Sequence, residues 1–155
     1  MNINNYREHL NKMKLDKEYR DNFNRNKLEE TIQEWKEMDK MINAEDVPDI
    51  PNNIDNEMWN KTFVPILIEK GAITKANLIN GKWYYGNYRN SEFGKWDAKN
   101  NKFHHLRYKF GYRWDECNHF EDDDGYALFV PLREANNEEI KEQEKIIKDG
   151  NLYTN

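Results

Sequence analysis

The chain has 155 residues, a formal net charge of −5 and a single cysteine, Cys117. This length fits one domain, one cysteine excludes an intrachain disulfide, and no apolar run approaches the roughly 18 residues of a membrane span. The first residues lack the apolar stretch of a secretion signal, so we expect a soluble protein of the cytoplasm. Charged residues make up 34% of the chain, which favours disorder, but 14% are aromatic, and their large buried areas favour a folded core.

Residues 1–46 are predicted to form a helical segment. Tyr6, Leu10 and Met13 recur at helical spacing, and a longer apolar stripe that includes Trp35 follows. Most other positions in the segment are polar, so these stripes must pack on the rest of the protein or on another chain. Both alternatives stay open, and the second would make the protein a homo-oligomer joined through its N-terminal helices.

Residues 55–148 are predicted to form an α+β domain, in which the segment 81–133 is rich in strands. A helix with Trp59 begins after Asp55, and Pro65 within it is expected to kink or restart it. Aromatic and β-branched segments separated by turns then indicate strands, and a charged helix ends the domain. The predicted strands are 82–89, 93–97, 102–110, 112–117 and 127–133. We therefore expect an antiparallel sheet of four or five strands, with N-terminal helices and a C-terminal helix on one side or end.

Positive charge is concentrated in the predicted strands. From Lys82 to Trp114 the local charge is +6, whereas the next ten residues carry six acidic side chains. Strand alternation would place His105, Arg107 and Lys109 on one face. Guanidinium groups suit phosphate and aromatic rings stack on bases, so this face is predicted to bind a nucleotide-like anion. The predicted ligand-binding residues are Tyr85, Arg89, Asn90, Lys95, Trp96, His105, Arg107, Lys109 and Arg113. A solvated face, partly neutralised by the acidic stretch, is the simpler interpretation and stays open.

The histidines and the cysteine of this region belong to no recognised catalytic motif. His104 and His105 are neighbours on a predicted strand and point to opposite faces, so they cannot act as one catalytic pair. His105 is interpreted as structural, with a general base or a ligand contact as the alternative. Cys117 belongs to no motif and is interpreted as a buried, small apolar residue.

The acidic stretch 119–124 supports two further hypotheses. His119, Glu121 and Asp123 could hold a metal ion in a small nuclease or phosphodiesterase, because carboxylate oxygens bind Mg²⁺ and Ca²⁺. Adjacent carboxylates converge only where the loop folds to bring them together, and the spacing fails the calcium-loop pattern. A solvated acidic turn is therefore the simpler interpretation, and no metal or cofactor is expected. As an exposed loop, 121–124 could also dock on a basic surface of another protein.

The central block of the chain resembles small proteins encoded by bacteriophages, over about the middle third to half of the sequence. The resemblance rests on Tyr84-Tyr85-Gly86, Arg89-Asn90, Trp96, Arg107-Tyr108-Lys109-Phe110-Gly111, His119, Glu121-Asp122-Asp123-Asp124-Gly125 and Phe129-Val130-Pro131. It implies a working place in the cytoplasm of the bacterial host. It also implies a small counter-defence protein that binds a defence protein or sequesters a nucleotide signal. No active-site residue is carried over with it.

The leading prediction is a non-enzymatic binding protein that captures a nucleotide-like anion, such as a cyclic nucleotide signal, on the cationic face. The first alternative is a protein–protein inhibitor of a host defence protein that uses the loop 121–124. The second is the metal-dependent nuclease or phosphodiesterase. General nucleic-acid binding is not favoured, because the isoelectric point of the chain lies near 5.5.

Overall fold

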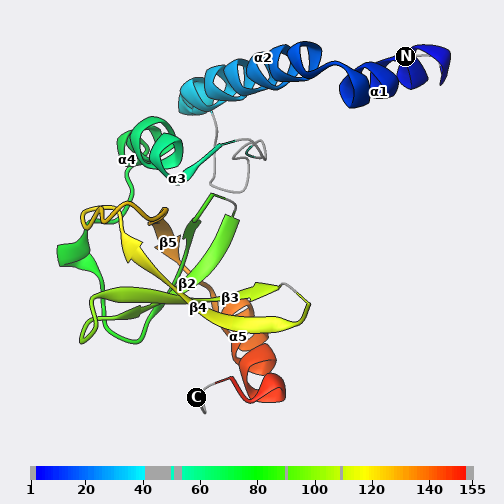
Figure 1. The fold of residues 1–155 in the computed structure, drawn as a ribbon. Helices are drawn as coiled ribbons and strands as arrows, with labels where there is room; N and C mark the ends of the chain where they lie inside the picture. Colours follow the sequence, from blue (N-terminus) through cyan, green and yellow to red (C-terminus); the bar gives the residue numbers. More distant parts are fainter. Residues whose placement is uncertain (1–2, 41–49, 51–53, 90, 109, 153–155) are drawn as a thin grey trace.

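The computed structural model describes residues 3–40, 50, 54–89, 91–108 and 110–152. A helical arm leads into a short helical layer, a five-stranded barrel and a C-terminal helix (Figure 1). The predicted α+β class, with helices at both ends of the chain and five strands between them, is confirmed. Within the described residues, none of the helices is both long enough and apolar enough to cross a membrane.

The helical arm consists of α1 (Ile3–Leu15) and α2 (Lys17–Lys36), separated at Asp16. The Asp16 carboxylate accepts a hydrogen bond from the Tyr19 backbone N–H at 3.1 Å and so caps α2. The start of the arm exposes Ile3, Tyr6 and Leu10. At its other end, Trp35 is buried against the helical layer that follows. The stripe around Trp35 therefore packs on the protein's own domain.

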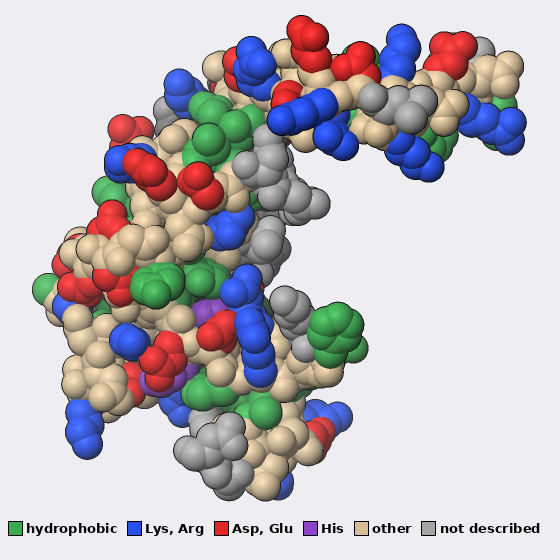
Figure 2. Space-filling model, viewed as in Figure 1, with side chains coloured by type: hydrophobic (Ala, Val, Ile, Leu, Met, Phe, Trp, Pro, Cys, Tyr) green, Lys and Arg blue, Asp and Glu red, His purple; other side chains and the backbone are tan. Residues whose placement is uncertain are grey.

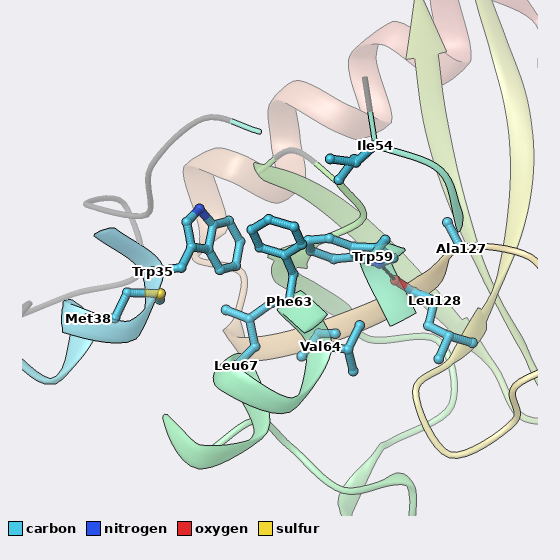
Figure 3. Packing of buried hydrophobic residues seen from close by; sticks show 10 residues of the cluster. Trp35, Met38, Ile54, Trp59, Phe63, Val64, Leu67, Ala127 and Leu128 are labelled. Carbon is cyan, nitrogen blue, oxygen red and sulfur yellow. Dashed lines mark hydrogen bonds between the residues drawn. The ribbon is translucent and has the colours of Figure 1, made fainter. Parts of the chain in front are cut away.

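The helical layer joins α3 (Asn56–Met58), a wider π-helical turn (Trp59–Phe63) and α4 (Val64–Glu69). Pro65 stands at the start of α4, directly after the π-helical turn, so the helical run continues through the proline with a change of helix type instead of a restart. Figure 3 shows the packing: the Trp35 ring meets Phe63 edge to face at 4.9 Å, and Trp59 lies beside them. These rings form the core between the arm and the barrel.

Five strands form a closed barrel in chain order. They are β1 (Trp83–Asn87), β2 (Ser91–Asp97), β3 (Lys102–Tyr108), β4 (Tyr112–His119) and β5 (Leu128–Glu134). The first four form an antiparallel meander, and β5 pairs antiparallel with β1 but parallel with β4. The expected antiparallel sheet is therefore mixed, because β5 begins beside the last two residues of β4 and runs in the same direction.

Closure of the barrel depends on Gly86. A Cβ atom at this position would collide with the Val130 carbonyl oxygen and would lie 2.9 Å from the Phe129 ring. The register of β1 on β5 shifts between Tyr85 and Gly86, which is the bulge that a glycine inside a strand suggests. Only a residue without a side chain lets the two strands approach here.

The C-terminal helix α5 (Asn137–Gly150) begins with a capping box between Asn136 and Glu139. The Glu139 carboxylate also accepts hydrogen bonds from both terminal guanidinium nitrogens of Arg133, at 2.8 and 2.9 Å, and these bonds connect the helix to the end of β5. The Trp83 indole N–H donates to Glu144 at 3.1 Å, so α5 is fixed to β1 as well.

Candidate functional site

The barrel interior has an apolar end and a polar end. Tyr84, Trp96, Phe103 and Phe129 pack together at the apolar end. Farther along β3 and β4, cross-strand pairs join Phe103 to Cys117, His105 to Asp115 and Arg107 to Arg113, so these alternate positions share one face. This face is buried at Phe103, His105 and Cys117 and opens to solvent at Arg113. The polar end of the interior is formed by Tyr88, Glu92, His105, Arg107, Asp115 and Cys117. The mouth of a barrel is a common position for a ligand site.

His105 lies at the centre of this polar end. Its side chain is 0% exposed, with Nδ1 at 3.5 Å from the Cys117 Sγ and Nε2 at 3.4 Å from the Glu92 Oε2. The Tyr88 ring packs on the imidazole at 4.9 Å. Burial lowers the pKa of His105 to about 4, raises the pKa of Glu92 to about 7, and raises the pKa of Cys117 well above its usual range. His105 and Cys117 are therefore held in their neutral forms at neutral pH, whereas Glu92 is close to half-protonated there.

The expectation of a wet face is wrong for His105, which is fully buried because sheet closure turns its side chain inward. Arg107 is only half-buried, but its guanidinium lies 5.2 Å above the Tyr88 ring and 3.7 Å from the Asp115 carboxylate. Arg113 approaches the same carboxylate at 3.5 Å. One acidic side chain thus partly neutralises both arginines within the molecule.

The two aromatic rings expected to stack on a ligand are buried. Trp96 is 4% exposed and packs on Phe103 inside the barrel. Tyr85 is 6% exposed, and the Arg133 guanidinium covers its ring at 4.4 Å. Their predicted exposure on a ligand-binding surface is wrong, because a ring that forms part of the core cannot stack on a base without opening the fold.

The other predicted ligand-binding residues are dispersed. Arg89 donates to the Ile54 carbonyl oxygen at 2.6 Å, and so connects β1 to the chain before α3. The Lys95 ammonium lies 3.8 Å from the Glu144 carboxylate of α5. Asn90 and Lys109 lie outside the described residues. The barrel therefore does not gather the described members of the predicted set on one surface.

The acidic loop 121–124 is held by bonds to its own surroundings. Asp122 forms an ion pair with Lys75 at 2.9 Å, Asp123 accepts from the Gly125 N–H at 2.9 Å, and Asp124 accepts from the Asn118 amide at 2.5 Å. These contacts match the simpler interpretation, a capped acidic turn.

His119 does not join the acidic loop in a metal site. Its ring is buried and lies 3.0 Å from the Ile73 carbonyl oxygen, and burial lowers its pKa. In the part of the chain that the structure describes, no three His, Cys, Asp or Glu side chains converge as metal ligands. His119, Glu121 and Asp123 are therefore not brought together as the nuclease hypothesis requires.

The β3–β4 hairpin carries the largest exposed aromatic group of the described chain. Its end bears Tyr108, Phe110 and Tyr112, which are 73%, 99% and 50% exposed and which we call the aromatic tip. Tyr108 and Tyr112 face each other across the strands with ring centroids 5.2 Å apart. Phe110 turns the chain with a φ of 58°, and Gly111 follows with a φ of 122°. Figure 1 shows the hairpin extending away from the barrel, and Figure 2 shows hydrophobic surface at its end.

The hairpin projects because its outer half lacks neighbouring strands. Among the described residues, β2 pairs with β3 only from Lys95 to Asp97, and β4 pairs with β5 only at Asn118 and His119. Beyond these pairs the two strands of the hairpin pair with each other alone. Sequence reasoning missed the aromatic tip, although three aromatic residues around Gly111 at a predicted turn were a usable signal.

A cleft of about 340 Å³ opens beside the hairpin, between β4 and the segment that leads into β5. Cys117 is one of its lining residues and is itself 5% exposed. The lining residues are Tyr88, Lys102, Asp115, Glu116, Cys117, Asn118, Asp124, Tyr126 and Ala127.

No protein-family model matches the chain, and neither a curated protein nor a solved structure shows significant similarity to it. Its function therefore has to be inferred from its own geometry.

Proposed function

We propose that the chain is a protein-binding module that inserts its aromatic tip into an apolar pocket of a partner protein. The observation that carries this proposal is the exposure of Tyr108, Phe110 and Tyr112 at the end of one projecting hairpin. Burying a Phe side chain stabilises a complex by about 1.5–3 kcal/mol, and this stabilisation is absent in the free protein because the tip is exposed. Contiguous exposed apolar groups of this kind mark interaction sites.

The shape of the tip favours a macromolecular partner. Sites for small molecules are concave and enclose most of their ligand, whereas this hairpin is convex and projects into solvent. A protruding hairpin instead fits a groove or pocket on another protein. The nucleotide-capture hypothesis stays a prediction, but its expected aromatic platform, Trp96 and Tyr85, is buried.

The residues beside the aromatic tip also suit a protein interface. Aromatic and arginine side chains dominate the binding energy of such interfaces. Arg107 and Arg113 flank the tip, and their side chains are 38% and 54% exposed. The partner pocket should therefore be apolar with an acidic rim. If the resemblance to phage proteins holds, the partner is a bacterial host protein.

The test compares single variants in a quantitative capture experiment from bacterial lysate, followed by affinity measurements with each purified candidate. Phe110→Ser should weaken the complex by about 30-fold or more, the loss expected for a hot-spot residue. Tyr126→Ser is the matched control, because Tyr126 is 70% exposed but lies outside the tip. A partner that binds wild type, Phe110→Ser and Tyr126→Ser equally would overturn the proposal.

A parallel thermal-shift panel of nucleotides separates the two ligand classes. A nucleotide that raises the melting temperature of wild type, but not of Arg107→Ala, would favour small-anion capture, because ligand that binds the folded state stabilises it. The protein-binding proposal expects no such shift.

A further inference from the structure

A thiol, an imidazole and a carboxylate form a line at the polar end of the barrel. The Cys117 Sγ lies 3.5 Å from His105 Nδ1, and His105 Nε2 lies 3.4 Å from Glu92 Oε2. The thiol comes from β4, the imidazole from β3 and the carboxylate from β2, so the three groups follow the order of these neighbouring strands. Within the described chain, neither His105 Nε2 nor Glu92 Oε2 has a hydrogen-bond partner, although both atoms are buried.

We propose that Cys117 is a nucleophilic thiol, with His105 as its base and Glu92 as the group that orients the imidazole, and that it accepts an acyl group from an uncharged or cationic ester or thioester. A nucleophile, a base and an orienting carboxylate are the parts that covalent catalysis requires, and here successive groups lie 3.5 Å and 3.4 Å apart. This site is separate from the aromatic tip and does not depend on the proposed function.

The cleft beside β4 supplies the substrate side of the site. Cys117 lines it together with Tyr88 and Tyr126, which offer apolar ring surface. Asp115 and Asp124 line the same cleft. Their negative charge disfavours anionic substrates, which is why the proposal is restricted to uncharged and cationic ones.

The proton and the acyl group can be followed through the step. The thiol proton moves to His105 Nδ1 while the sulfur attacks the carbonyl carbon, and the Nε2–H donates toward Glu92. The carbon–oxygen or carbon–sulfur bond of the substrate then breaks, and the leaving alkoxide or thiolate takes the proton from Nδ1. The products are an S-acyl Cys117 and a free alcohol or thiol. Burial raises the pKa of the Cys117 thiol, so the thiol keeps its proton until the bond forms and needs a neighbouring base, as a hydroxyl nucleophile does.

Because Cys117 is the only cysteine, its acylation can be measured without interference from other thiols. The full chain is treated with p-nitrophenyl acetate at pH 7.5, and mass spectrometry of the peptide that contains Cys117 follows the acetyl group over time. We expect faster acylation in the folded chain than in the urea-unfolded chain. Glu92→Gln, which keeps the shape of the side chain, should slow the reaction of the folded protein by about tenfold.

Glu134→Gln is the matched control, because Glu134 is an exposed carboxylate of β5 that pairs with Lys82, away from the thiol. Circular dichroism confirms that each variant is folded. Iodoacetamide and iodoacetate provide a second, charge-sensitive pair of probes, and the uncharged iodoacetamide should alkylate Cys117 faster. Equal rates for wild type and Glu92→Gln, or labelling that appears only in the unfolded chain, would overturn the proposal.

Discussion

The Trp59 indole N–H donates a hydrogen bond to the backbone carbonyl of Leu128 at 2.9 Å, across 69 residues of sequence. Both residues are buried. The bond fastens the helical layer to the first residue of β5, and thereby joins the core of the arm to the wall of the barrel.

Replacement of Trp59 by Phe is expected to destabilise the fold. The substitution removes the donor and leaves the Leu128 carbonyl buried without its partner, which costs about 1–3 kcal/mol, and the smaller ring adds a cavity. Urea unfolding followed by circular dichroism measures the change in the free energy of unfolding. A loss well below 1 kcal/mol would show that the bond does not hold the two layers together.

Gly86→Ala is expected to disrupt closure of the barrel. The added methyl group would meet the Val130 carbonyl and the Phe129 ring, both on β5, so the strands would have to separate. Gly71→Ala is the comparison, because Gly71 has a φ of 91° but open space around it, and its cost is the backbone strain of roughly 1 kcal/mol. Gly86→Ala should lose at least about 3 kcal/mol or fail to fold. Similar melting temperatures for the two variants would contradict this account of closure.

The stability of the protein is expected to fall on the alkaline side because of Glu92. Burial raises its pKa from 4.5 to about 7, so the folded state holds a proton that the unfolded chain has already released. The contribution of Glu92 to the free energy of unfolding is therefore fully present below pH 4.5. It is lost as the pH rises through 7, by up to about 3 kcal/mol. Glu92→Gln should be more stable than wild type at pH 8.5, with a smaller difference at pH 5. The check is urea unfolding at both values, and a constant difference would contradict the prediction.

On the acid side, His105 should have the opposite effect. Burial lowers its pKa from 6.5 to about 4, so between these pH values the imidazole is protonated in the unfolded chain but neutral in the folded chain. Stability from this group is present above pH 6.5 and is lost as the pH falls toward 4, by up to about 3 kcal/mol. His105→Gln should show a flatter dependence in this range. His119 has a pKa lowered by burial as well, so part of the slope should remain in the variant.

The strands could be predicted from the sequence because their signal is local. Alternation and turn residues gave 102–110 and 112–117 for the hairpin, and the structure has Lys102–Tyr108 and Tyr112–His119. Closure could not be predicted in the same way, because it depends on β5 pairing with β1, which is distant in sequence, and on a parallel pairing with β4 that no turn motif specifies. Closure decides which face of each strand is interior.

The candidate site was therefore only partly predictable. Strand alternation correctly predicts that His105 and Arg107 share one face, but polarity alone does not distinguish a solvated face from a polar interior. A small barrel can also put polar residues at the open end of its interior, and here Glu92 and Cys117 meet His105 from two other strands. No spacing in the sequence relates these three positions.

The early end of strand pairing along the hairpin has a consequence for solubility. Unpaired strand edges are templates on which another chain can add, and so open a route to aggregation. Arg107 and Arg113 stand opposite each other across this ribbon. A second copy that approached edge to edge would bring its own arginines against them, and the repulsion of like charges would keep the ribbons apart.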